Sequence, residues 1–230
     1  MVKLYELKCK ICGEELLGTR RDKGFCCRNC GYIKFFQEER LSNITNVDLL
    51  DDIVKGFLDP GSEIEYFFLR EREKEEFYLP FWFFLLRITF FSDVFSQKFN
   101  GIWSIFYPAF KYDGFLYFGN PGEKFVSFEE KKDFLKLNDP LIGIVSTPFF
   151  SYLKAVFMFI KFIDRKRDIT DTDFKIKHLS SKIVGIPFKR DDIYLKSYSV
   201  SVDEYGNSVE MKVKFPHFSV DNLSDILDFF

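Results

Sequence analysis

Two short stretches decide how the N-terminal part of this chain folds: Cys9-Lys-Ile-Cys12-Gly13 and Cys27-Arg-Asn-Cys30-Gly31. Each is C-x-x-C followed by glycine, and 14 residues separate the second cysteine of one from the first cysteine of the other. Two thiolates three positions apart on a tight turn can bind one ion, and a tetrahedral site needs four. Glycine after each motif permits the positive φ of such a turn. The pattern therefore predicts a tetrathiolate metal site formed by Cys9, Cys12, Cys27 and Cys30.

Four sulfur ligands suit zinc or iron. The two motifs resemble those of zinc ribbons, in which each motif lies at the end of a β-hairpin, and the match covers about 36 residues. The resemblance implies a structural Zn²⁺ ion. It implies no particular activity, because zinc ribbons occur in transcription factors, ribosomal proteins, polymerase subunits and adaptors. An iron site like that of rubredoxin is an alternative, although the spacing between the motifs is short for that family.

Cys26 leaves one ligand open, because it could replace its neighbour Cys27. We prefer Cys27, since it alone reproduces the C-x-x-C-Gly form of the first motif. Two disulfides are another interpretation, but they require an oxidising compartment, and the N-terminus has no signal-peptide pattern. A redox pair would need one C-x-x-C opening a helix. We therefore expect a zinc-binding, cytoplasmic protein.

The composition is that of a folded protein rich in aromatic side chains. The 230 residues include 32 phenylalanines, and aromatic residues make up 20% of the chain. Lysine and arginine number 33 against 35 acidic residues, which excludes intrinsic disorder driven by net charge. The longest uncharged run, residues 140–153, has 14 residues. A membrane-spanning helix needs about 20, so no transmembrane segment is expected.

The chain divides into three predicted parts and is expected to have an α+β fold. Residues 1–37 form the zinc ribbon, residues 38–61 a linker with one helix, and residues 62–230 an aromatic-rich β domain. Short apolar runs between turn residues predict a barrel- or sandwich-like domain with one or two helices.

Strands are expected at residues 64–69, 76–91, 103–106, 115–118, 183–188, 193–202 and 209–215. Helices are expected at residues 149–163 and 220–230. The charged string at residues 70–76 is interpreted as a solvated hairpin tip or strand face.

A proline followed or preceded by aromatic residues recurs five times in the β domain. The prolines are Pro80, Pro108, Pro148, Pro187 and Pro216, with spacings of 28, 40, 39 and 29 residues. The symmetric spacing suggests an internal duplication. Because proline cannot donate to a β-ladder, we expect these elements at strand corners, with an aromatic groove as the alternative. The Pro-Phe-Trp and Tyr-Pro-Ala-Phe segments behind a zinc ribbon resemble bacterial zinc-ribbon proteins of no established activity, which implies architecture alone.

A basic cluster lies on the hairpin loop and the second motif of the ribbon: Arg20, Arg21, Lys23 and Arg28. Residues 1–36 carry eight cationic and four acidic side chains. The cluster could contact a partner or nucleic-acid phosphates. The simpler interpretation is ordinary solvation of a small module, and an overall pI of about 5.8 argues against a dedicated nucleic-acid binder.

No catalytic motif is evident, and we lean against an enzyme. His178 and His217 are isolated in sequence, and adjacent carboxylates such as Asp51 and Asp52 point to different faces. The first hypothesis for function is a non-enzymatic adaptor that binds another protein. A nucleic-acid-associated protein is the second. The third is a peripheral component of a membrane complex, suggested by the phenylalanine-rich segments 77–91 and 149–163.

Overall fold

The computed structural model describes residues 8–18, 22–35, 63–91, 99–110, 133–166, 173–191, 194–202 and 208–216. These residues form eight strands and one helix: β1 (Gly24–Cys26), β2 (Tyr32–Phe35), β3 (Glu63–Phe68), β4 (Glu76–Phe90), β5 (Gly101–Pro108), α3 (Pro148–Lys166), β6 (Phe174–Asp191), β7 (Tyr194–Val202) and β8 (Ser208–Pro216). The predicted β-rich character, with a helix beside the strands, is confirmed for this part of the chain.

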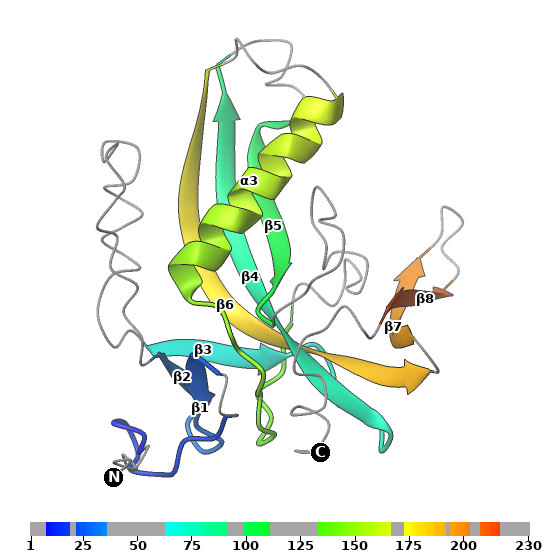
Figure 1. Cartoon of the computed structure of the whole chain (residues 1–230). Coiled ribbons are helices and arrows are strands. Elements are labelled where there is room, and N and C mark those ends of the chain that lie inside the picture. Colours follow the sequence, from blue (N-terminus) through cyan, green and yellow to red (C-terminus); the bar gives the residue numbers. More distant parts are fainter. Residues whose placement is uncertain are drawn as a thin grey trace.

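The strands form one open mixed sheet. Six of them follow the order β1-β2-β3-β6-β4-β5, while β7 pairs with the end of β6 and β8 pairs with β7. β3 and β6 are parallel, and every other paired set is antiparallel. Figure 1 shows the short strands β1 and β2 at one end of this sheet and the β7–β8 pair at the other. A barrel- or sandwich-like closure is not confirmed by the described strands.

Strand β4 is the centre of the sheet, since all of its 15 residues pair with β6 in an antiparallel register. Its sequence is a nearly continuous run of aromatic and branched apolar residues. Such a run is expected of a strand that is covered on both faces, because alternating polar residues would have no solvent to face. Trp82 and Phe84 lie on one face, and Phe81 and Phe83 lie on the other. The strand therefore separates two apolar layers.

Helix α3 covers the first of these faces (Figure 1). Tyr152 and Phe159 of the helix pack edge-on or tilted against Phe84 of β4 and Trp103 of β5, with ring centroids 5.6 and 5.1 Å apart. The helix expected at residues 149–163 is thus confirmed, and it extends from Pro148 to Lys166. Proline suits the first turn, because its missing N–H would have no helical partner there.

The second face is covered beside residues 77–83 of β4, where residues of the 133–143 segment and Leu195 of β7 pack against it. Phe81, Phe106 and Phe188 form an aromatic layer there, together with Ile142 and Leu195. Phe134 lies edge-on to Phe83 and Phe106. Among the described residues of strands β3–β6 and helix α3, most phenylalanines are therefore core residues on the two sides of one sheet.

Three predicted elements fall outside the described residues: the helix of the linker at residues 38–61, the strand at 115–118 and the helix at 220–230. The division into a ribbon, a linker and a β domain, and the internal duplication, remain predictions. The strand expected at residues 76–91 is confirmed with nearly the same bounds. The strand expected at 183–188 is part of the longer β6. The apolar pattern predicted only its apolar core, because polar residues precede that core in the sequence.

The five prolines occupy different structural positions. Pro108 and Pro216 end strands, and Pro148 begins α3. Pro80 and Pro187 lie inside β4 and β6, opposite Gly185 and Tyr78, so the expectation of corners is wrong for both. Each nevertheless lies where a neighbouring strand stops. β3 pairs with β6 up to Gly185 and β7 pairs from Lys189 onward, which leaves Pro187 in the gap between them.

The charged string at residues 70–76 is not a hairpin tip, because β6 lies between β3 and β4. It contains a buried ion pair. The side chain of Glu76 is 1% exposed, and both of its oxygens accept hydrogen bonds from Arg70 at 2.7 Å. The Glu73 N–H donates to the same carboxylate at 2.8 Å. Burial raises the pKa of Glu76, but these donors outweigh it and lower the pKa overall.

Replacement of Glu76 by glutamine should destabilise the fold by about 3 kcal/mol, because the Arg70 guanidinium loses its buried counter-charge. In the parent chain, the ion pair should add stability above the ordinary glutamate pKa of about 4.3. That stability should be lost as pH falls through the lowered pKa of folded Glu76, since the unfolded carboxyl binds a proton more readily. Denaturant unfolding between pH 7 and pH 3, followed by circular dichroism, measures both effects.

Glu75 provides the matched control, because its side chain is 70% exposed in its pair with Lys189. The same change at Glu75 should leave the unfolding free energy nearly unchanged, since an exposed pair contributes little. Equal destabilisation by the two substitutions would contradict the role assigned to the buried pair.

Candidate metal centre

The two cysteine motifs fold into the same kind of turn. The N–H of Gly13 donates to the carbonyl of Cys9 at 2.9 Å, and the N–H of Gly31 donates to the carbonyl of Cys27 at 3.1 Å. The two glycines have φ values of 78° and 73°. This is the left-handed region that the sequence predicts for both positions, where a side chain would be strained. The spacing of the motifs therefore translates directly into two matching turns.

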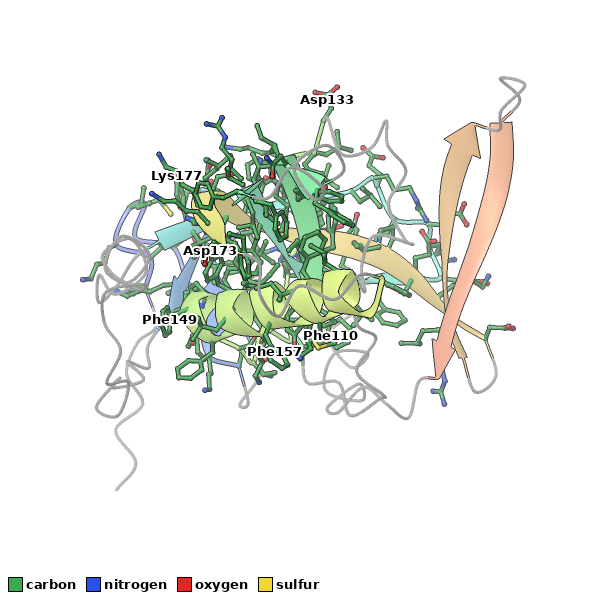
Figure 2. The ribbon with its side chains drawn as sticks, turned by 90° about the horizontal axis from the view of Figure 1, so that it is seen from above. Phe110, Asp133, Phe149, Phe157, Asp173 and Lys177 are labelled. Atoms are coloured by element: carbon green, nitrogen blue, oxygen red, sulfur yellow. The ribbon has the colours of Figure 1, made fainter. Side chains whose placement is uncertain are left out.

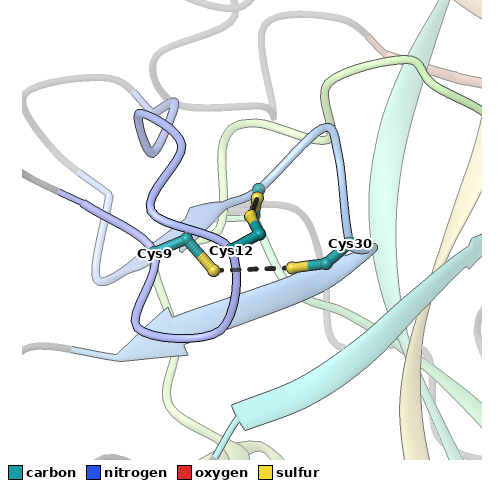
Figure 3. Close-up of side chains that lie close together, drawn as sticks. Cys9, Cys12 and Cys30 are labelled. Atoms are coloured by element: carbon teal, nitrogen blue, oxygen red, sulfur yellow. Dashed lines mark hydrogen bonds between the residues drawn. The ribbon is translucent and has the colours of Figure 1, made fainter.

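The turns bring four sulfur atoms together (Figure 3). All four Sγ atoms of Cys9, Cys12, Cys27 and Cys30 lie within 4.8 Å of one another. The Cys9–Cys30 and Cys12–Cys27 Sγ distances are both 3.4 Å. A tetrahedral ion with Zn–S bonds of about 2.3 Å requires sulfur atoms about 3.8 Å apart. The cluster therefore fits one tetrahedral metal ion with modest adjustment of the side chains.

Short strands hold the two turns against each other. The second turn connects β1 to β2, which pair from Gly24 opposite Phe35 to Cys26 opposite Ile33. The first turn is closed by a bridge between Lys8 and Glu15. The chain then returns to β1, where Leu17 and Cys26 exchange two backbone hydrogen bonds of 2.8 Å. Each pair of sulfur ligands is thus fixed by backbone pairing close to it.

The electrostatics of the cluster favour a cation. Hydrogen bonding from the Glu14 backbone lowers the pKa of Cys12 to about 7, whereas burial raises the pKa values of Cys27 and Cys30. Four thiolates so close together repel one another strongly. A divalent metal ion supplies the counter-charge that lets all four ionise together.

Cys26 has a different environment from its neighbour Cys27. Its side chain is completely buried in the main core, and its sulfur accepts a hydrogen bond from the Leu141 N–H at 3.4 Å. Burial raises the pKa of this thiol to about 12, so it stays protonated. The structure groups Cys27 with the other three cysteines and assigns Cys26 to packing.

The cluster is attached directly to the sheet. β2 pairs with the first half of β3, and the second half of β3 pairs with β6. The Tyr66 hydroxyl of β3 lies 3.0 Å from the carbonyl oxygen of Cys27 and 3.3 Å from that of Asp139. Asp22 accepts a hydrogen bond from the Gly143 N–H at 3.0 Å. Tyr66 and Asp22 were missed at the sequence level, because their partners lie up to 121 residues away and leave no local pattern.

The predicted basic cluster is only partly described. Arg20 and Arg21 lie outside the described residues. The backbone N–H of Lys23 donates to the Ile144 carbonyl at 2.7 Å, and the exposed Arg28 donates through Nε to the Asn138 carbonyl at 3.4 Å. Both residues are thus tied to the loop that covers the sheet, and a shared contact surface of the four cations remains a prediction.

His178 lies in β6 on the face covered by α3. Its ring packs edge-on to Tyr152 with centroids 5.4 Å apart, and burial lowers its pKa. This position agrees with the structural role predicted for it. His217 lies outside the described residues.

No protein-family model, curated protein or solved structure matches this chain. The geometry of the four sulfurs therefore carries the assignment of the site by itself.

Substitution of Cys12 by serine should weaken metal binding by more than about a hundred-fold, because even outer-shell changes at metal sites cost 10- to 100-fold. Substitution of Cys26 by alanine should leave the metal content unchanged, although it should destabilise the core around Leu141. Metal analysis of the purified chains by mass spectrometry, with a thiol titration, measures the stoichiometry.

A comparison of the Cys26→Ala chain with a Cys27→Ala chain tests which of the two adjacent cysteines binds metal. Loss of the metal from the Cys26→Ala chain while a Cys27→Ala chain keeps it would show that the ligand assignment is wrong.

Proposed function

We propose that this chain is a zinc-binding, non-enzymatic binding protein in which a structural zinc ribbon holds one end of a β-sheet in place. The observation that carries the proposal is the convergence of four cysteine sulfurs within 4.8 Å beside strands that continue into the main sheet. Structural zinc sites use four protein ligands, whereas catalytic sites keep one position open for water or substrate. Cys9, Cys12, Cys27 and Cys30 would complete the coordination.

Zinc is favoured over other metals by the ligand set. Thiolate sites with tetrahedral geometry select zinc or iron, and the short loop between the motifs favours the zinc ribbon. The five described cysteines are free thiols rather than disulfides. Thiols that lie this close together without forming disulfides suit a reducing compartment, which supports the proposed cytoplasmic location.

The proposed binding role is supported by the contacts between the ribbon and the sheet. Contacts of Tyr66, Asp22 and Cys26 join it to the sheet and to residues 139–144, so it acts as a clamp on the domain. A clamp of this kind stabilises surfaces on the sheet to which a partner can bind. An adaptor that binds another protein is the simplest form of such a role.

A membrane role has less support from the described residues. The side chains of Phe149, Tyr152, Phe159 and Ile163 on α3 are buried. Among the helix side chains whose burial is described, Phe157 is the large apolar one that is more than half exposed. Among the described helical residues, none form a helix with the length and apolar character needed to cross a bilayer.

Removal of the metal by a strong chelator should loosen the ribbon and β3 before the rest of the sheet. Structural zinc supplies the folding free energy of its module, and the ribbon and β3 share the pairing of Ile33 with Ile64. Hydrogen exchange followed by mass spectrometry should show faster exchange in β1–β3. Peptides from the β4–β6 ladder serve as the internal control and should keep their protection.

Metal analysis of the same preparation identifies the ion. Iron in place of zinc, or unchanged exchange in β1–β3 after complete metal removal, would contradict the structural zinc role.

A further inference from the structure

The segments that form the centre of the fold contain cationic side chains and no acidic ones. Residues 77–91, 99–110, 141–163 and 174–190 contain eight lysines and arginines and no acidic residue. The whole chain has 33 cationic and 35 acidic residues, so the acids are concentrated elsewhere in the sequence. A sheet and helix with this segregation present a local positive field to any ligand that can reach them.

Three of these cations share one face of the sheet. Arg87 of β4 pairs with Lys177 of β6, and Lys175 follows on the same face two residues away. Directly opposite side chains on one face lie about 5 Å apart. All three are exposed, and Figure 2 shows Lys177 pointing away from the side of the sheet that carries α3. They form the basic sheet face, defined as Arg87, Lys175 and Lys177.

No described acidic side chain forms an ion pair with this face. Arg87, Lys175 and Lys177 form no ion pair among the described residues, whereas Lys136 and Lys189 pair with Glu65 and Glu75. Like charges directly opposite on a sheet destabilise it. The Arg87–Lys177 pair is therefore a cost to the fold that an anionic ligand would relieve.

The basic sheet face also offers apolar surface. Ile102 of β5 lies opposite Arg87 and is 57% exposed, and Phe91, directly after β4, is 67% exposed. Further along the same side, the ammonium of Lys182 lies 4.7 Å from the ring centroid of Phe67 and 5.3 Å from that of Phe134. Cations interleaved with apolar and aromatic side chains are the combination that single strands of nucleic acid bind, through phosphates and base faces respectively.

We propose that the basic sheet face binds a single-stranded nucleic acid, whose phosphates contact Arg87, Lys175 and Lys177 while bases lie against Ile102 and Phe91. The inference names a partner for the proposed binding role and therefore rests on it, although it does not depend on the identity of the metal. An acidic protein segment would satisfy the charges, but its carboxylates would leave the exposed Phe91 and Ile102 without apolar contacts. The exposed acids Asp173 and Asp133 border this side of the sheet. Their negative charges limit how far a bound nucleic-acid strand could extend.

The test uses the full-length, metal-loaded chain and a fluorescein-labelled single-stranded oligonucleotide, as RNA and as DNA, in a fluorescence anisotropy titration. Binding should weaken as salt rises from about 50 to about 200 mM, with a slope near −0.7 per phosphate contact. Lys175→Gln together with Lys177→Gln should weaken binding roughly ten-fold at moderate salt and reduce the slope by about 1.4. Phe91→Ala should lower affinity without changing the slope, because stacking involves no counterion release.

The matched control is Lys154→Gln together with Lys161→Gln, which removes the same charge from exposed positions of α3 on the opposite side of the sheet. This control should bind the oligonucleotide like the parent chain. Equal losses from both double variants, or equally tight binding of a polyglutamate peptide of matched charge, would overturn the proposal in favour of a non-specific field or an acidic protein partner. The α3 double variant keeps the basic sheet face intact. If anionic vesicles displace the oligonucleotide from this variant, the face binds a membrane instead, and the proposal is overturned.

The metal content and circular dichroism of each preparation separate the two proposals. No oligonucleotide binding by a folded chain with its full metal complement refutes the nucleic-acid inference and leaves the structural zinc role intact. Oligonucleotide binding that survives in a folded, metal-free chain supports the nucleic-acid inference and contradicts the structural zinc role.

Discussion

The ladder between β4 and β6 is the interaction on which the rest of the structure depends. It joins two segments about 100 residues apart through 15 cross-strand pairs, with one shift of register between Leu85 and Leu86. Because side chains alternate along both strands, the ladder assigns every residue of β4 to one of two faces. One face receives α3, and the lower half of the other receives residues 133–143. None of the described residues is seen to cover the part of that second face around Arg87, whose side chain is exposed.

The cysteine cluster is coupled to this ladder through the six residues of β3. Glu63–Phe68 pairs first with the ribbon strand β2 and then with β6, so one short strand belongs to both units. The adjacent cysteines 26 and 27 show the same division. Cys26 points into the main core, and Cys27 points into the sulfur cluster. A metal ion that fixes Cys27 would thereby fix the packing of its neighbour against Leu141.

What could be predicted from the sequence is what depends on short spacings. The two C-x-x-C-Gly motifs specify their own turns, so the four sulfurs and both positive φ values were predictable. The bounds of β4 and α3 follow from local apolar patterns and were predicted within a few residues. The order of the strands was not, because a parallel pair such as Tyr66 with Ile183 depends on contacts between distant segments. For the same reason residues 70–76 were interpreted as a solvated hairpin tip or strand face, and the burial of Glu76 was missed.

The charge pattern shows why overall composition alone does not decide which partner a local face of the molecule can bind. A pI of about 5.8 argues against binding to a polyanion only if the charges act as one average field. In physiological salt, exposed charges interact over about 8 Å, a distance that spans two neighbouring strands but not the molecule. At that range Lys177 responds to Arg87 and Lys175, and acids in distant parts of the chain are screened. The ladder register, which places these cations side by side, therefore decides what the face can bind, and the sum over the chain does not.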